Sequence, residues 1–137
     1  NCFAGDVAGV RLQGCDYLSV AAAPPQFDPV AYLDSITRLH EANFESLFLT
    51  HFGEVTDVSR HLTRYAQRVG MVADVVQRLT DQGLGGEARR AAYTRLEHDL
   101  AIKCGATGGQ WRRYELANSS AMGADGIALF HEKNPQP

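Results

Sequence analysis

Apolar residues recur along the second half of the chain at the spacing of one helix face. Between residues 58 and 79 the intervals alternate between four and three, which is the heptad pattern of a helix with one apolar seam. The Val58–Leu79 seam consists of Val58, Leu62, Tyr65, Val69, Val72, Val76 and Leu79. The pattern predicts a long amphipathic helix that ends at the glycines of GLGG, residues 83–86.

Two further helices are predicted after this one. The first covers residues 87–103 and ends at GATGG, residues 105–109. The second is shorter and lies within residues 111–131, with an interruption near Gly123 and Gly126, because glycine weakens a helix interior. The second half of the chain is therefore expected to be helical.

The first part of the chain has a different, strand-like pattern. Short apolar runs predict strands at residues 2–4, 17–20 and 45–51, and glycines and prolines separate them. One helix is predicted between them, from the N-cap Asp28 to about Asn43, because apolar residues follow at helical spacing. A helix followed by a strand in this way is typical of a sheet covered by helices.

These two patterns define the predicted organisation of the chain. Residues 1–56 are expected to form an α/β part, and residues 57–137 an α-helical extension. The expected fold class is therefore mixed α+β, with a sheet and its covering helix in the first part and helices alone in the second.

The composition is that of an ordinary globular domain. Of the 137 residues, 45% are apolar and 21% are charged, and the formal net charge is -3. This charge gives no general attraction to nucleic acid or to anionic membrane, so we expect neither as a partner. Cys2, Cys15 and Cys104 are widely spaced and include no Cys-x-x-Cys pair. They predict neither a disulfide framework nor a zinc knuckle, and favour a reducing, cytoplasmic location.

A histidine stands where the last strand of the first part ends. In FLTHFGEV, residues 48–55, His51 follows an apolar run and precedes Gly53. One interpretation is structural, with His51 capping the strand end and hydrogen-bonding to backbone. The other is functional, with His51 projecting from a rigid strand end into a site, as metal-binding and catalytic histidines do. The residue alone leaves both interpretations open.

A second candidate residue lies at the end of the first strand. In FAGDVAG, residues 3–9, Gly5 allows a sharp turn, and the Asp6 carboxylate can project from the carboxyl edge of the strand. This is the edge at which α/β folds bind ligands. Aspartate and histidine are both good ligands for zinc and iron, and a carboxylate can bridge two ions. Asp6 and His51 together therefore indicate a metal site at two strand ends.

Four segments, in this order, resemble the C-terminal half of the metallo-β-lactamase-fold hydrolases, and most closely the branch that carries an α-helical extension. They are FAGDVAGVRL (3–12), PPQFDPVAYLDSITRL (24–39), SLFLTHFGEVTDV (46–58) and, at the end of the extension, YELANSSAMGADGIALF (114–130). The resemblance covers nearly the whole chain. It implies that residues 1–56 form part of a metallo-β-lactamase-like αββα layer and that residues 57–137 form the extension.

The resemblance also implies an activity and its residues. It makes Asp6 a catalytic residue that bridges two zinc or iron ions, and His51 the last ligand of the second metal. The implied reaction is metal-assisted hydrolysis of an ester, thioester, lactone or lactam bond in a small-molecule substrate. The family's His-x-His-x-Asp-His motif has no counterpart among the five histidines of this chain. We therefore expect a C-terminal portion of a larger enzyme, inactive alone, whose missing N-terminal half supplies the other ligands.

A non-catalytic function is the alternative. The Val58–Leu79 seam can pair with another helix, either in the same chain, with Leu96 and Leu100 opposite it, or in a second subunit. The chain would then be a helical interaction or oligomerisation module on a degenerate scaffold, forming a homodimer through its helices. His61 lies on the polar side of the seam and is expected to be solvated.

Overall fold

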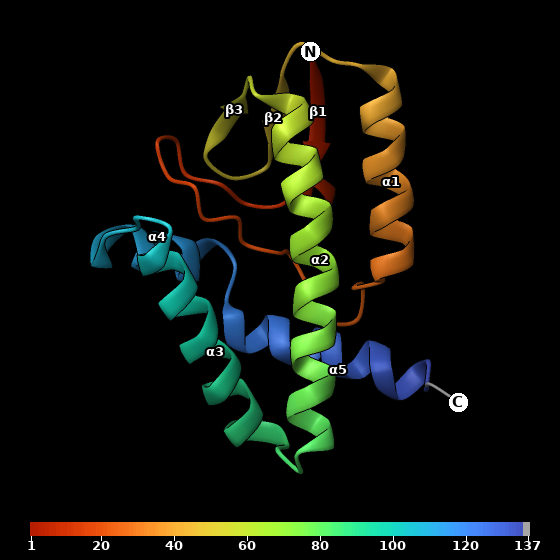
Figure 1. The fold of residues 1–137 in the computed structure, drawn as a ribbon, viewed down its shortest axis with the longest axis vertical. Coiled ribbons are helices and arrows are strands. Elements are labelled where there is room, and N and C mark those ends of the chain that lie inside the picture. The colour runs from red at the N-terminus through yellow and green to blue at the C-terminus, as the bar shows by residue number, and fades with distance from the viewer. Residues whose placement is uncertain (136–137) are drawn as a thin grey trace.

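The computed structural model describes residues 1–135, so the last two residues of the helical part 57–137 lie outside the described residues. The described chain is a mixed α+β fold with one three-stranded sheet and five α-helices (Figure 1). In chain order the elements are β1 (Cys2–Gly5), the 3-10 turn η1 (Asp6–Ala8), α1 (Pro29–Ala42), β2 (Leu47–Leu49), β3 (Gly53–Val55), α2 (Val58–Asp81), α3 (Gly86–Lys103), α4 (Gly108–Ala117) and α5 (Ser120–Lys133). The mixed fold class predicted from the sequence is confirmed at this level.

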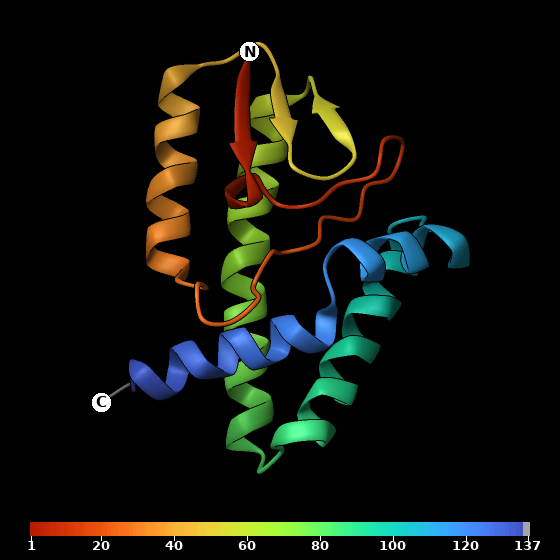
Figure 2. The ribbon, with the colours of Figure 1, turned by 180° about the vertical axis from the view of Figure 1, so that it is seen from behind.

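The strands form a sheet in the order β1-β2-β3. Strands β1 and β2 are parallel, which requires the crossover through α1, and β2 and β3 form an antiparallel hairpin (Figure 2). The prediction of a strand at residues 17–20 is wrong, because only an isolated bridge between Val10 and Ser19 forms there. The apolar side chains of this segment are buried in the two core clusters instead, outside the sheet.

The Val58–Leu79 seam lies on α2 as predicted, and all of its side chains are buried. They share one core cluster with Leu47 of β2, Ile36 of α1 and Ile127 of α5. Helix α2 crosses one face of the sheet with α1 beside it, and α5 crosses α2 on the way to the C-terminus (Figures 1 and 2). The seam is therefore covered by elements of its own chain.

Helix α3 buries a different face from the one predicted, which carried Leu96 and Leu100. The buried side chains of α3 are Tyr93, Glu97 and Ala101, whereas Leu96 is 48% exposed. Glu97 is buried because it pairs with Arg68 of α2. The inner face thus carries an ion pair and a tyrosine in place of leucines, which an apolar pattern alone does not reveal.

The predicted helix at residues 111–131 is two helices, and its interruption lies elsewhere than predicted. Helix α4 starts with a capping box at Thr107, and α5 starts after Ser119, whose hydroxyl accepts from the Met122 amide. Both expected breaking points, Gly123 and Gly126, lie inside α5. Gly126 is needed there because a Cβ at this position would lie 1.7 Å from the Ala22 carbonyl oxygen.

The predicted boundary after residue 56 falls just before α2. The main core cluster nevertheless contains side chains from both sides of it, such as Leu49 and Leu62. The division into 1–56 and 57–137 therefore stays a prediction. Among the helices of residues 1–135, none combines the length and the apolar character that crossing a bilayer requires.

Candidate functional site

Asp6 and His51 follow the carboxyl ends of the two parallel strands. Asp6 comes directly after Gly5, the last residue of β1, and His51 comes shortly after Leu49, the last residue of β2. Gly5 and Leu49 are register partners in the sheet. The two candidate residues are therefore delivered to the same edge, where α/β sheets bind ligands.

Both side chains line a single pocket of about 160 Å³. The remaining lining residues are Val10, Ala21, Ala23, Gln26, Tyr32, Ala117 and Asn118. They come from the segment between η1 and α1, from α1 itself and from the junction of α4 and α5. The structure thus brings together the two residues that the sequence singled out, and adds walls from distant parts of the chain.

Helix α2 holds the turn that carries Asp6. The His61 Nε2 atom lies 2.8 Å from the Ala8 carbonyl oxygen, which places the ring proton on Nε2 as the donor. Gly9, with φ of 83°, approaches Tyr65 so closely that a Cβ would lie 2.4 Å from the ring. The prediction that His61 is solvated is wrong, since the side chain is 1% exposed and bonded to this turn.

His51 lies in the three-residue turn Thr50–Phe52 that joins β2 to β3. Phe52 has a φ of 71°, which is rare for a bulky residue and costs on the order of 1–3 kcal/mol. Contacts with α4 offset this strain. The Phe52 ring lies edge-on to Tyr114, with ring centroids 6.2 Å apart, and the Arg113 guanidinium lies 5.0 Å from the Phe52 centroid.

The surroundings of His51 bear on its two interpretations. Its side chain is half-buried, and within residues 1–135 its ring forms no hydrogen bond. The rings of His40, His61 and His131 each do. The capping interpretation requires such a bond to backbone, and the described residues provide none; His98 also lacks one, so the functional interpretation of His51 stays a prediction.

Two further polar residues shape the pocket wall. The Tyr32 hydroxyl donates to the Ala21 carbonyl oxygen at 2.7 Å. Burial, and then the charge of Asp6, raise the pKa of Tyr32, so the phenol stays protonated. The Asn118 amide donates to the Ser19 hydroxyl at 2.7 Å and to the Val20 carbonyl oxygen at 2.8 Å. Both residues therefore hold the segment that forms one side of the pocket.

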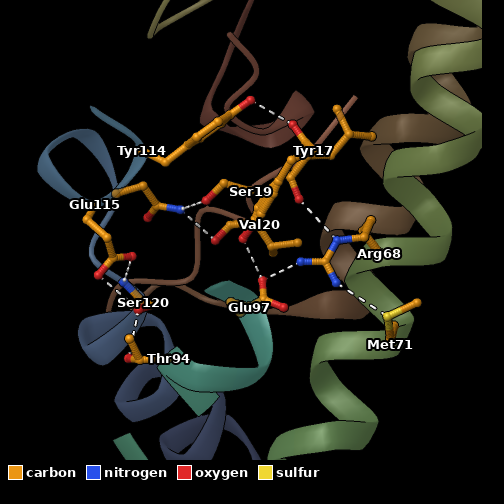
Figure 3. A network of polar contacts seen from close by, with 12 residues as sticks. Tyr17, Ser19, Val20, Arg68, Met71, Thr94, Glu97, Tyr114, Glu115 and Ser120 are labelled. Atoms are coloured by element: carbon orange, nitrogen blue, oxygen red, sulfur yellow. Dashed lines mark hydrogen bonds and ion pairs between the residues drawn. The ribbon is translucent and has the colours of Figure 1, made fainter. Parts of the chain in front are cut away.

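The same segment is also anchored by a buried polar network (Figure 3). Arg68 of α2 donates to Glu97 of α3 and to the Leu18 carbonyl oxygen, and the Tyr17 hydroxyl donates to Glu97 at 2.9 Å. The Arg68 guanidinium also lies 5.6 Å from the Tyr17 ring centroid. Helices α2 and α3 therefore fix the irregular segment of residues 10–26, which forms part of the pocket wall.

The sequence did not point to Tyr32, Asn118 or Phe52. Tyr32 lies in an ordinary amphipathic helix, and Asn118 reaches the pocket only because α4 and α5 pack where they do. Phe52 is the one with a local signal, since it stands between His51 and Gly53 in a tight turn. A residue next to a candidate ligand in such a turn is a reasonable place to look for a positioning contact.

The donor set fits zinc or iron as part of a site. A carboxylate and an imidazole are ligands that both metals accept. Within residues 1–135, no group of three or more histidine, cysteine, aspartate or glutamate side chains is placed to hold a metal ion. Asp6 and His51 can therefore supply part of the three or four protein ligands that a zinc site uses.

Comparisons of the chain with protein-family models, with curated proteins and with solved structures found no match. The metallo-β-lactamase resemblance therefore stays a prediction from the quoted segments. What the structure adds is independent of it, namely the two candidate ligands in one pocket at the ends of parallel strands.

Proposed function

We propose that this chain is the C-terminal part of a metal-dependent hydrolase of the metallo-β-lactamase fold, with Asp6 and His51 as two of its metal ligands. The observation that carries the proposal is the shared pocket, because the sequence singled out these two residues and both line it. The sheet and α1 would be part of the αββα layer, and the helices from α2 onward would be the extension.

Six of the residues that line the pocket have a role in this proposal. The Asp6 carboxylate would bridge two zinc or iron ions, and the His51 ring would donate one nitrogen to the second. When bound, such ions polarise a carbonyl or phosphoryl group and lower the pKa of water. Tyr32 and Asn118 keep the wall in place, and the small side chains of Ala21 and Ala23 leave room for a small-molecule ester, thioester, lactone or lactam.

We further propose that the other ligands lie on polypeptide outside these 137 residues, the N-terminal half of the domain. The open face of the sheet supports this partner. Phe3 is 86% exposed, and its ring centroid lies 5.2 Å from that of Phe48, its register partner. Phe48 lies on the central strand β2 and is half-buried, so the exposed ring is that of Phe3 on the edge strand β1. Parallel strands are normally covered on both faces, and an exposed aromatic side chain on such a face is a candidate contact with another part of a fold. The chain alone would then be inactive.

A cytoplasmic location is also proposed. Cys2, Cys15 and Cys104 are all free thiols, which suits a reducing compartment.

The alternative of a helical interaction module is less well supported. The Val58–Leu79 seam that suggested it is buried within the chain, so a homodimer through this seam would first have to expose it. A homodimer through another surface stays a prediction.

The experiment that tests the proposal restores the missing ligands. The chain is fused to, or co-expressed with, an N-terminal half of a metallo-β-lactamase domain that carries His-x-His-x-Asp-His. We expect bound zinc or iron by elemental analysis and hydrolysis of an activated ester or thioester. Asp6→Ala and His51→Ala should each lower the rate by orders of magnitude, and His51→Ala should mainly deplete the second metal.

His98→Ala is the matched control, because His98 is a partly exposed histidine on α3 outside the pocket. It should leave both metal content and rate unchanged. Full activity without Asp6 and His51, or a reconstituted protein that holds no metal, would reject the proposal.

A further inference from the structure

We propose that Phe52, Arg113 and Tyr114 form a clamp that positions His51. We call these three residues the α4 clamp, because two of them lie on helix α4. The inference rests on the proposed function only in treating His51 as a metal ligand. In it, the three residues are positioning residues that act on the metal site through the turn that carries His51.

The first step of the argument is the conformation of the turn. Phe52 directly follows His51 and adopts a φ of 71°, which a bulky side chain seldom does. Such a conformation persists only where surrounding contacts hold it. The contacts that can do so come from Tyr114, edge-on to the Phe52 ring, and from Arg113, whose guanidinium lies over that ring.

The second step is the rigidity of the residue that Phe52 packs against. Tyr114 is 1% exposed, and its hydroxyl donates to the Tyr17 carbonyl oxygen at 2.8 Å while accepting from the Leu12 amide at 2.9 Å. Its ring also lies edge-on to the Tyr17 ring, 4.9 Å away between centroids (Figure 3). Tyr114 is thus held by both its ring and its hydroxyl, and provides a fixed surface for Phe52.

The third step joins the clamp to the pocket. The turn Thr50–Phe52 is only three residues long, so a displacement of Phe52 displaces His51 as well. The same helix α4 ends at Ala117, and Ala117 and Asn118 line the pocket together with His51. Helix α4 and its C-cap therefore set the position of the candidate ligand His51 and also form part of the pocket wall.

Two substitutions separate the clamp from the fold. In Phe52→Gly the ring is removed while the new residue adopts a positive φ freely, so the turn geometry itself remains allowed. Arg113→Ala removes the cation from an exposed position, and Arg112→Ala is its matched control, since Arg112 is the exposed neighbour outside the clamp. Phe52→Tyr keeps the ring and serves as the conservative variant.

The first measurement is the backbone order of residues 50–53 by 15N relaxation in the metal-free 137-residue chain. The wild type and Phe52→Tyr should show rigid order parameters of about 0.85 there, and Phe52→Gly should fall below about 0.6. Arg113→Ala should give a smaller loss, and Arg112→Ala none. Order within residues 69–79 of α2 should stay the same in every variant.

The second measurement is zinc binding followed at the His51 ring signals during titration with Zn²⁺. Loss of an orienting contact typically weakens metal binding by about 10–100-fold, and we expect a loss of this size in Phe52→Gly. Phe52→Tyr and Arg112→Ala should bind zinc as the wild type does. Zinc binding should match the wild type in every variant that keeps both an aromatic ring at position 52 and the Arg113 guanidinium.

The outcomes separate the clamp from the proposed function. Unchanged order at residues 50–53 in Phe52→Gly and Arg113→Ala would overturn the clamp, even if zinc binding were weaker. Loss of order in variants of a wild type whose His51 signals do not respond to zinc would support the clamp and reject His51 as a ligand. Loss of both order and binding supports the clamp and the ligand role together.

Discussion

Two histidines of this chain show how strongly surroundings decide what one residue type can do. His51 is half-buried at a pocket, whereas His61 is fully buried with its Nε2 atom on the Ala8 carbonyl oxygen. Among the described atoms, the other ring nitrogen of His61 has no partner. A second proton on that nitrogen would therefore be a buried donor without an acceptor, which favours the neutral ring.

This environment predicts how stability depends on pH. Burial lowers the pKa of His61 from its ordinary value of 6.5, and the charges of Arg11 and Arg64 act in the same direction. The Ala8 carbonyl and Asp57 oppose the shift without cancelling it. The unfolded chain therefore binds a proton near pH 6.5 that the folded chain does not yet bind. The stability is fully present above this pH and decreases as the pH falls below it.

The variant that tests this prediction is His61→Gln, whose amide can still donate to the Ala8 carbonyl oxygen. The free energy of unfolding is measured by urea denaturation at pH values on either side of about 6.5. The wild type should lose up to about 1.4 kcal/mol per pH unit more than the variant as pH falls. Equal pH dependence in the two proteins would show that His61 is not a buried neutral residue.

At the scale of residues, the sequence identified the two candidate site residues but not the side chains that hold them in place. Asp6 and His51 could be found because each follows a strand and a glycine lies nearby, which is local information. The role of His61 could not, because it lies beside the seam, three residues after Val58, and its partner is a distant carbonyl group. Contacts of this kind depend on how the elements pack.

At the scale of elements, the crossing of α5 over the segment before α1 depends on one glycine. Gly126 lies inside α5 and has no room for a Cβ, because the Ala22 carbonyl oxygen would lie 1.7 Å from it. Gly70 of α2 is also a helix-interior glycine, but nothing lies within 4 Å of a Cβ built there. The two positions therefore separate helix propensity from close packing.

We predict opposite effects for alanine at these two glycines. Gly126→Ala forces α5 away from Ala22 and should lower the free energy of unfolding by about 1–3 kcal/mol or more. Gly70→Ala should raise it by about 0.5–1 kcal/mol, because alanine is the better helix former. Urea denaturation of both variants measures the difference. A stabilised Gly126→Ala would contradict the close approach of α5 to Ala22.

The elements that the sequence predicted correctly are those with sustained periodicity. Helix α2 has a long seam and glycines after it, and α1 has an N-cap at Asp28, whose carboxylate accepts from the Val30 and Ala31 amides. Residues 17–20 resembled a strand because they are apolar, yet helices bury them. A short apolar run shows that a segment is buried but not which elements bury it.

At the scale of the whole molecule, the sheet is the more open part and the helices are the closed part. Strand β1 pairs with one neighbour, and Phe3 on it is exposed, whereas the centre of α2 is enclosed by α1, α3 and α5. Protection against hydrogen exchange should follow this difference, because local opening is easiest where few side chains are buried.

We therefore predict slower amide exchange in residues 69–79 than in residues 2–5 and 47–50. Hydrogen exchange of the chain, resolved by NMR or by mass spectrometry, measures both regions in one sample. Stronger protection of the strands than of α2 would contradict this account of where the stability resides. Addition of the proposed N-terminal half should slow exchange in β1 more than in α2.

The relation between the two parts of the molecule was the least predictable feature. The sequence separated residues 1–56 from 57–137 by their patterns, but the helical part reaches back to hold both candidate ligand turns. His61 of α2 bonds to the turn after Asp6, and Tyr114 of α4 packs on the turn of His51. Such contacts join residues that are far apart in the chain, and no local pattern encodes them.

The central claim is that Asp6 and His51 share one metal site, and a paramagnetic titration of the chain tests it most directly. Co²⁺, which accepts the same ligands as zinc, is added to the isotope-labelled 137-residue chain, and line broadening is followed at every residue. His98 and Asp99, a solvent-accessible pair 3.5 Å apart on α3, provide the internal control. We expect weak binding, because a complete zinc site uses three or four protein ligands. The signals of Asp6 and His51 should nevertheless broaden together and before those of the control pair, and Asp6→Asn or His51→Ala should abolish the effect. Broadening that appears equally at His98 and Asp99, or that persists without Asp6 and His51, would contradict the account.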